Sequence, residues 1–536
     1  MRTLAAVFLA SSLLLTADDG HQHTGKPPEK LGRVNFVTSC SAKAQSDFER
    51  GLALLHSFWF EQAEKSFHDA AQADPHCGIA WWGMAASHYH PLWEPPTPAE
   101  LAAGSAFIAE AGKLSAPTQR ERDFIAALAD FYRDYRHRPH AERARAWSDA
   151  MARAHQHSPD DSEATMFYAL SLIAIQSPTD KTYAQYRRAG ELLIPIFDRQ
   201  PGHPGVAHYV IHACDAPPLA HMGLAAARRY AQIAPSVPHA LHMPSHIFTR
   251  LGYWEDSIAS NRAAASAGEA YARAEHATAG WTEALHALDY LAYAYLQSGQ
   301  DSRALAVVRE AAEIGAGDGS LKAGYPLAAI PARYALERRD WKAAAALQPA
   351  PGAPAVPPAI RLWARSIGAA RSNQLDKARA GVTQLAAMRD ALAKQEPYWS
   401  GQVEIMRLEA ASWLALAEKE PGALELARAA ADKEDSADKS NITPGSVLPA
   451  RELLADLLLE LKQPAQALAE YEASLQSAPR RFNSLYGAAR AAELAGNKEK
   501  ARTYYTQLHD VARNGERKQI EFARKAAGII IDGPVN

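Results

Sequence analysis

The chain has 536 residues, more than one hydrophobic core normally supports, so we expect several domains or a repeat array. Hydrophobic residues make up 48% of it and charged residues 22%, an ordinary globular composition that excludes wholesale disorder. Lys and Arg total 57 against 60 Asp and Glu, so no uniform basic field exists to bind a nucleic acid or an anionic membrane.

The N-terminus has the pattern of a secretory signal. Met1-Arg2 precedes an apolar run from Leu4 to Leu15, which ends on the small residue Ala17. We therefore predict a signal peptide over residues 1–17, a flexible segment over 18–37, and export to the periplasm or the medium. The run is too short to cross a bilayer and no later run is longer, so no membrane span is expected.

Helical repeats are predicted from residue 38 onward. Aromatic and small residues recur from Phe60 to Pro75 with the spacing of a packed helix pair, and His56 and His90 lie 34 residues apart. Cys40 and Cys77 each precede a predicted first helix of a pair. In an oxidising compartment they could form a disulfide, and the alternative is two buried thiols.

The middle of the chain carries two His-x-x-x-His pairs. His208 and His212 form one pair, His242 and His246 form the other, and the two pairs are 34 residues apart. A spacing of four places both rings of a pair on one helix face, and packed neighbouring helices lie about 8–10 Å apart. The sequence therefore predicts four imidazoles in one patch, with His239 beside them.

The C-terminal part repeats the same period. Ala467 and Ala501, like Tyr471 and Tyr505, lie 34 residues apart. Proline-rich or turn-rich breaks fall at 349–359 and 438–449. We predict an all-α fold in two lobes, a solenoid over 38–348 and further repeats over 360–536, joined by a Pro-rich linker at 349–359.

These features resemble the tetratricopeptide repeat (TPR) family, in which antiparallel helix pairs stack into a superhelix. Segments such as His90-Pro-Leu-Trp93 and His242-Met-Pro-Ser-His246 are similar to a group of exported bacterial TPR proteins without an established activity. The resemblance implies that first-helix positions face a concave groove that binds ligands. Aligning Gly252 with Gly299 sets His286 opposite His239, Asp289 opposite His242 and Tyr293 opposite His246.

Such a groove indicates a transition-metal site. Neutral imidazoles with few carboxylates and no paired thiolates suit copper or zinc best, and iron and nickel stay open. The expected metal ligands are His208, His212, His239, His242, His246 and His286. Beside them or along the groove we expect Asp215, Glu283, Asp289, Tyr293 and His203, with His56, His88 and His90 as more distant candidates. Both His pairs lack the Glu of zinc metalloproteases, which disfavours that chemistry.

A second interpretation keeps the groove without the metal. The protein would then be a scaffold that holds a partner's peptide or protein segment, and its histidines would be incidental. Pro238 and Pro244 could also break the second helix and turn its rings apart. No nucleophile–base pair can be read from the sequence, so whether a reaction is catalysed stays open.

Overall fold

The structure is a computed structural model that describes residues 29–92, 94–114, 116–349 and 356–529. The predicted signal peptide, the first part of the segment over 18–37 and most of the predicted linker lie outside these residues. All regular elements in the described part of the chain are helices, in agreement with the predicted all-α class.

The helices follow one another through short turns. The first part contains α1 (Ala42–His56), α2 (Phe60–Ala73), α3 (Gly78–Ser87), α4 (Pro98–Ala111), α5 (Gln119–Tyr132), α6 (His140–His157), α7 (Ser162–Ala174) and α8 (Ala184–Arg199). The middle contains α9 (Pro204–Cys214), η1 (Ala220–Gly223), α10 (Leu224–Ile233), α11 (Pro238–His242), α12 (Pro244–Leu251), α13 (Trp254–Glu275), α14 (Thr278–Gln297), α15 (Asp301–Ile314), α16 (Leu321–Glu337) and α17 (Trp341–Ala345). The last part contains α18 (Val356–Arg371), α19 (Leu375–Leu392), α20 (Pro397–Glu418), α21 (Ala423–Asp435), α22 (Ala450–Glu460), α23 (Pro464–Ser477), α24 (Phe482–Leu494), α25 (Lys498–Val511) and α26 (Lys518–Ala527).

A recurring turn joins the two helices of many pairs. Its central residue adopts a left-handed backbone, with φ of 69° at Gly252, 70° at Gly299 and 81° at Gly496. Glycine adopts this conformation without a steric penalty, and the same turn is made at a cost by Lys462 and by Phe58. One turn geometry thus produces several of the antiparallel helix pairs in the described part of the chain.

Small residues allow the pairs to pack closely. Gly51 of α1 and Gly83 of α3 both face the ring of Phe67 on α2, where an added Cβ would come within 2.9 and 2.4 Å of it. Gly487 receives the ring of Tyr471 in the same way. Because these contacts leave no room for a side chain, the repeating aromatic and small residues of the sequence fix the spacing of the helices.

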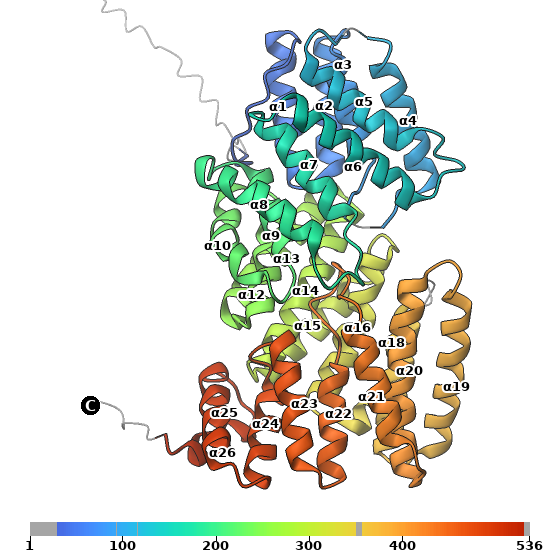
Figure 1. Cartoon of the computed structure of the whole chain (residues 1–536), viewed down its shortest axis with the longest axis vertical. Helices are drawn as coiled ribbons and strands as arrows, with labels where there is room; N and C mark the ends of the chain where they lie inside the picture. The colour runs from blue at the N-terminus through green and yellow to red at the C-terminus, as the bar shows by residue number, and fades with distance from the viewer. Residues whose placement is uncertain (1–28, 93, 115, 350–355, 530–536) are drawn as a thin grey trace, which may run out of the picture.

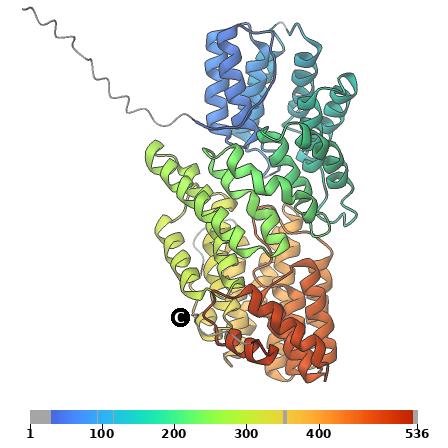
Figure 2. The same ribbon diagram turned by 90° about the vertical axis from the view of Figure 1, so that its left-hand side faces the viewer.

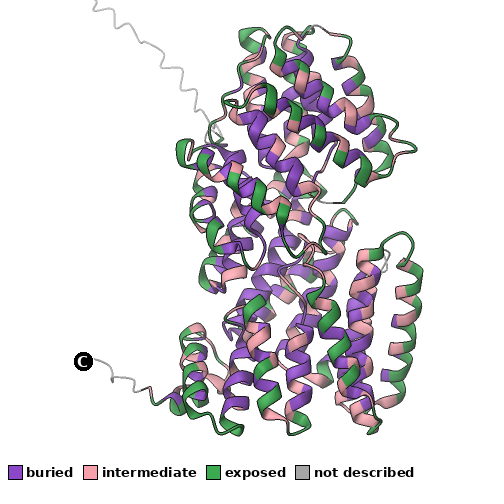
Figure 3. Cartoon of the chain, in the orientation of Figure 1, coloured by how far each residue is buried: buried purple, intermediate pink, exposed green. Residues whose placement is uncertain are grey.

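The helix pairs stack into an elongated solenoid, with α1–α5 at one end and α22–α26 at the other (Figure 1, Figure 2). Buried residues line the helix faces that meet inside the stack, and exposed residues follow its outer rim (Figure 3). Among the described residues, the buried apolar side chains form one cluster up to Phe248, a second from Leu321 to Ala527, and a third from Trp254 to Ile330 between them. The division into two lobes stays a prediction.

Two predicted boundaries differ from the structure. Residues 29–37 are not free, because Arg33 N–H donates to the Gly202 carbonyl and Phe36 is fully buried in the core. The linker predicted over 349–359 ends earlier than expected, because α18 already begins at Val356. Pro357 lies in the first turn of that helix, where a missing N–H leaves no hydrogen bond unmade.

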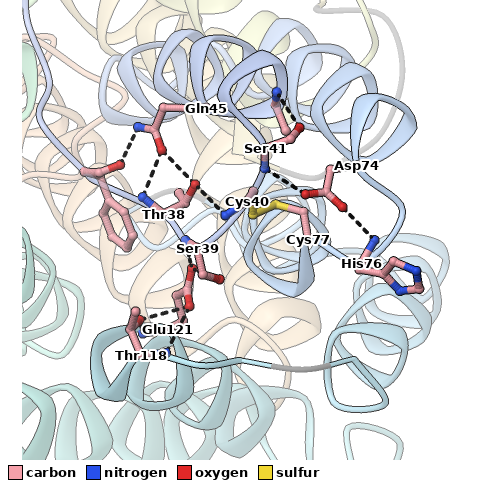
Figure 4. The surroundings of a disulfide bond; sticks show 12 residues. Thr38, Ser39, Cys40, Ser41, Gln45, Asp74, His76, Cys77, Thr118 and Glu121 are labelled. Atoms are coloured by element: carbon pink, nitrogen blue, oxygen red, sulfur yellow. Dashed lines mark hydrogen bonds between the residues drawn. A yellow bond between two sulfur atoms is a disulfide. The ribbon is translucent and has the colours of Figure 1, made fainter.

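Cys40 and Cys77 form a disulfide, one of the two outcomes that the sequence left open. It ties the segment before α1 to the start of α3 (Figure 4). The surrounding hydrogen bonds hold the same segment, because Ser41 N–H donates to Asp74 and Ser39 N–H donates to Glu121. Cys214, the remaining cysteine, is buried as a thiol.

In the part of the chain that the structure describes, no helix is both long and apolar enough to cross a membrane.

Candidate metal centre

Six of the predicted ligands gather in the middle of the solenoid as two groups of three. His208 and His212 of α9 meet His239 of α11, and we call this group the first histidine triad. The Nε2 atom of His208 lies 3.1 Å from Nε2 of His212 and 3.2 Å from Nε2 of His239. All three rings are buried, so three imidazole nitrogens share one small interior space.

The second histidine triad consists of His242 of α11, His246 of α12 and His286 of α14. Nε2 of His242 lies 3.0 Å from Nε2 of His246, and the ring centroids of His242 and His286 are 4.4 Å apart. The helix breaks at Met243 between α11 and α12, as proline at 244 suggested, yet the rings on both sides of the break converge.

The two triads lie side by side. Ring centroids are 6.0 Å apart between His212 and His246 and 6.1 Å apart between His239 and His242. The sequence predicted a single patch made from the two His-x-x-x-His pairs. The structure instead gives two adjoining groups, each completed by a third histidine from another helix.

In three of the histidines, a hydrogen bond from Nδ1 determines that the inward-facing Nε2 has no proton. Nδ1 of His208 donates to the His56 carbonyl at 2.7 Å, and Nδ1 of His246 donates to the Asp215 carboxylate at 2.8 Å. Nδ1 of His242 donates to the side-chain oxygen of Asn261 at 2.7 Å. A neutral imidazole carries one N–H, so Nε2 of each of these rings is a bare lone pair.

This arrangement leaves a contact that neutral imidazoles cannot satisfy. The lone pairs of His242 and His246 face each other at 3.0 Å, and neither ring has a second proton to share. The third member, His286, buries Nδ1 without a hydrogen-bond partner among the described residues. A cation between the rings would satisfy these nitrogens. Ligands at 2.0–2.1 Å from a tetrahedral zinc ion lie roughly 3.3 Å apart, close to the observed separations.

Burial keeps the rings neutral. It lowers the pKa of His208 to about 3, and together with the neighbouring imidazoles it holds the pKa of His212 and His242 well below the ordinary range. Burial likewise lowers the pKa of His246, although Asp215 opposes the shift. Protonation of the triads is therefore disfavoured, and the neutral form is the one that binds metals.

Asp215 fixes the orientation of His246. Its carboxylate accepts hydrogen bonds from His246, from Arg250 at 2.8 Å and from Lys439 at 2.9 Å. Burial alone would raise its pKa, but Lys439 and Arg250 outweigh burial and hold the pKa well below the usual range. Asp215 is thus a charged group behind a candidate ligand, the place that carboxylates often take beside metal-binding histidines.

His56 and His203 form a separate group around a buried carboxylate. Glu163 accepts hydrogen bonds from Nε2 of His56 at 2.9 Å and from Nε2 of His203 at 3.0 Å. His203 Nδ1 in turn accepts the Gly205 N–H, and His56 Nδ1 bonds the Tyr209 hydroxyl. With both nitrogens of each ring used, hydrogen bonding alone accounts for this group, which supports the first triad through the His56 carbonyl.

The register predicted for α14 is shifted. His286 packs on His242 rather than opposite His239, and Tyr290, not Tyr293, lies against the second triad at 4.7 Å from the His242 ring. Asp289 faces away and pairs with Arg333 at 3.3 Å. The α13–α14 pair is longer than its neighbours, so the offset taken from Gly252 and Gly299 misplaces α14 by about one turn.

Tyr293 belongs to another buried network. Its hydroxyl accepts from Arg481 at 2.8 Å, and Arg481 also pairs with Glu337 and Glu452. Among the described residues, its ring and hydroxyl contact Trp254, Arg333 and Arg481 rather than a histidine of either triad.

Glu283, His88 and His90 lie in the wall of a neighbouring cavity. Glu283 is 3.7 Å from Nδ1 of His239 and also pairs with Lys322. His88 faces Glu64 at 3.3 Å and His90 faces Glu100 at 3.9 Å. The structure therefore separates His88 and His90 from the triads, whereas Glu283 adjoins the first one.

Several residues of the centre carried no signal in the sequence. Asn261 of α13 accepts from His242, Tyr290 covers His246, and Lys439 reaches Asp215 from 224 residues along the chain. A single Asn or Lys on a helical or turn-rich stretch is usually a surface residue. Only the packing of distant segments shows that these side chains are buried against the histidines.

Comparison with known proteins does not indicate a function for this chain. No family model matches the chain, and no curated protein matches it. Among solved structures it is similar to a human IFIT1 dimer with PPP-AAAA, at 11% identity and a TM-score of 0.35, covering 86% of this chain and 89% of that one. The TPR domain of P58(IPK) is 13% identical with a TM-score of 0.21, covering 91% of this chain and 99% of that domain. TM-scores this low support no conclusion about function. The repeat architecture is instead established by the stacked helix pairs of this chain.

Proposed function

We propose that this protein is an exported metal-binding repeat protein that holds two transition-metal ions, copper or zinc, one in each histidine triad. The observation that carries the proposal is the pair of facing lone pairs on His242 and His246, 3.0 Å apart in a buried site. Two neutral imidazoles repel in that geometry, and a divalent cation turns the repulsion into two coordinate bonds.

The first triad supports the same proposal. His208 presents its lone pair toward two further imidazoles, and its tautomer is fixed by a backbone carbonyl that can only accept. Metal-ligating histidines usually donate their other nitrogen to a carbonyl or carboxylate in this way. Three protein ligands would leave a coordination position for a small molecule, as in catalytic rather than structural metal sites.

Elemental analysis of the full chain, purified without a polyhistidine tag, tests the proposal. After loading with copper or zinc and dialysis, we expect two ions per chain. Replacing one ligand of each triad separately, His212→Ala and His246→Ala, should remove one ion each, and the double variant should bind none. Electron paramagnetic resonance would identify bound Cu(II), and the elemental readout also detects iron and nickel.

The exposed His137 provides the matched control, because its side chain is 79% exposed. His137→Ala should keep both ions, and far-UV circular dichroism should show that all variants retain their helices. A chain that stays metal-free after loading, or a His137→Ala variant that loses metal as readily, contradicts the proposal. The remaining function would then be a scaffold that holds a partner segment without metal.

A further inference from the structure

A cavity of about 460 Å³ opens beside the first histidine triad. Its wall includes the α1–α2 turn, the start of α4, the adjoining ends of α13 and α14, and the turn before α16, and His239 stands in it. The volume lies within the range of sites for small molecules. One of the proposed metal ligands is therefore also part of the wall of a site with room for a ligand.

Acidic side chains dominate the charge of this cavity. Its wall contains Glu61, Glu64, Glu94, Glu100, Glu283 and Asp318. Lys322 stands among them and pairs with Glu283. Burial and the nearby Asp318 raise the pKa of Glu94, as expected where like charges gather. A cation entering the cavity would relieve this repulsion, whereas an anion would add to it.

Aromatic rings make up the apolar part of the wall. Phe58, Trp59, Phe60 and Tyr271 all line it, and the rings of Trp59 and Tyr271 meet edge to face at 4.9 Å. Ring faces attract cations and stack on other rings. An acidic and aromatic wall fits a ligand that combines positive charge with an aromatic body.

Phe58 connects the cavity to the triad. Its ring centroid is 4.4 Å from that of His208 and 5.9 Å from that of His239. It occupies the left-handed turn position that Gly252 and Gly299 occupy in other pairs, with φ of 55°. A bulky residue is unfavourable there, so placing a ring at this position carries a backbone penalty.

We propose that this cavity binds an organic cation with an aromatic ring, an arylalkylamine, next to the ion of the first histidine triad. The placement of the amine beside a metal ion rests on the proposed function, but recognition of the amine rests on the cavity alone. The volume of about 460 Å³ suits a compact molecule better than an extended strand, which favours an amine over a peptide.

Calorimetric titration of the full chain with phenethylamine tests the proposal, with 3-phenylpropionate as a probe of similar shape and opposite charge. Metal-free protein should bind the amine, and the acid should bind at least about tenfold more weakly. The double variant Glu94→Gln/Asp318→Asn should weaken amine binding on the order of tenfold. Tyr271→Leu should weaken it about threefold or more through the lost ring face.

The control Glu142→Gln changes an exposed carboxylate outside the cavity and should leave amine affinity unchanged. In copper-loaded protein the proton resonances of bound phenethylamine should broaden, and in zinc-loaded protein they should not. Equal binding of amine and acid, no binding of either, or binding only of lysine-containing peptides overturns the inference. Two bound ions without amine binding would refute this inference alone, and amine binding by a chain that takes no metal would refute the proposed function alone.

Discussion

At the residue scale, the histidines were visible in the sequence and their partners were not. The spacing of His208, His212, His242 and His246 predicted neighbouring rings because repeat and helix periods are regular. The split into two triads depends on His239 and His286, whose positions follow from a helix break and from an unusually long helix pair. Asn261 could not be singled out, since one asparagine on a helix has no pattern.

Asn261 offers a test of how the second triad is oriented. Its side-chain oxygen accepts from His242, and its Nδ2 donates to the Ser257 carbonyl at 2.8 Å, which fixes the amide orientation. Asn261→Ala removes that acceptor, so we expect metal affinity at the second triad to fall about 10–100-fold. Competition titration with a chelator measures the change. Asn261→Asp keeps an oxygen and should retain most of the affinity, and the exposed Asn514→Ala should have no effect. Equal losses in all three variants would refute the positioning role.

At the element scale, the sequence predicted the helix pairs and their period, but it did not predict the register of α14 correctly. Aromatic and small residues identify a pair wherever Phe67 or Tyr471 fills the space left by a glycine. The 22-residue α13 and 20-residue α14 exceed the usual repeat, so counting from turn to turn fails there. The disulfide was one of two outcomes because spacing alone cannot show that two cysteines approach.

Helix α20 carries a buried acid that should make stability depend on pH. Glu409 is 3% exposed and its Oε1 has no hydrogen-bond partner among the described residues. Burial and the nearby Glu434 raise its pKa well above the ordinary 4.5. The folded state then holds a proton that the unfolded state releases, so this contribution to stability is complete below pH 4.5 and is lost as the pH rises toward the folded pKa.

Glu409→Gln should remove that dependence. At pH 8 we expect the variant to be more stable than the natural chain by about 1–3 kcal/mol, because no charge has to be buried. At pH 4.5 the two should be nearly equal. Urea denaturation at both pH values gives the comparison, with the exposed Glu425→Gln of α21 as the control. A variant that is less stable at pH 8 would show that the carboxylate has a stabilising partner.

At the scale of the whole molecule, the centre combines segments from both ends of the solenoid. Residues 436–449, which we call the covering segment, connect α21 to α22 and contact Asp215 and Tyr290, which adjoin the second triad. Lys439 donates to Asp215, and the Thr443 carbonyl accepts from Tyr290 at 3.0 Å. The sequence identified this stretch only as a break between helices, since nothing local indicates what a loop packs against.

Metal loading should therefore slow hydrogen exchange in the covering segment. Binding stabilises the closed arrangement relative to local opening, and at saturating metal we expect exchange at 438–447 to slow about tenfold or more. Hydrogen–deuterium exchange with mass spectrometry, with and without metal, measures the change. The α18–α19 turn at 372–374, whose backbone N–H groups bond carbonyls at the end of α18, should exchange at the same rate in both states. A uniform response of both segments would indicate global stabilisation instead.

The unprotonated state of the buried rings has a consequence for the energetics of loading. Zinc fingers must shed thiol protons as the ion enters, so their uptake acidifies the medium and its heat varies with the buffer. Here the imidazoles are already neutral in the folded protein near pH 7, because burial holds their pKa values well below the ordinary range. If the triads bind metal as proposed, we therefore expect uptake near neutral pH to release no protons from these rings, and its enthalpy to be nearly the same in buffers of different ionisation heat.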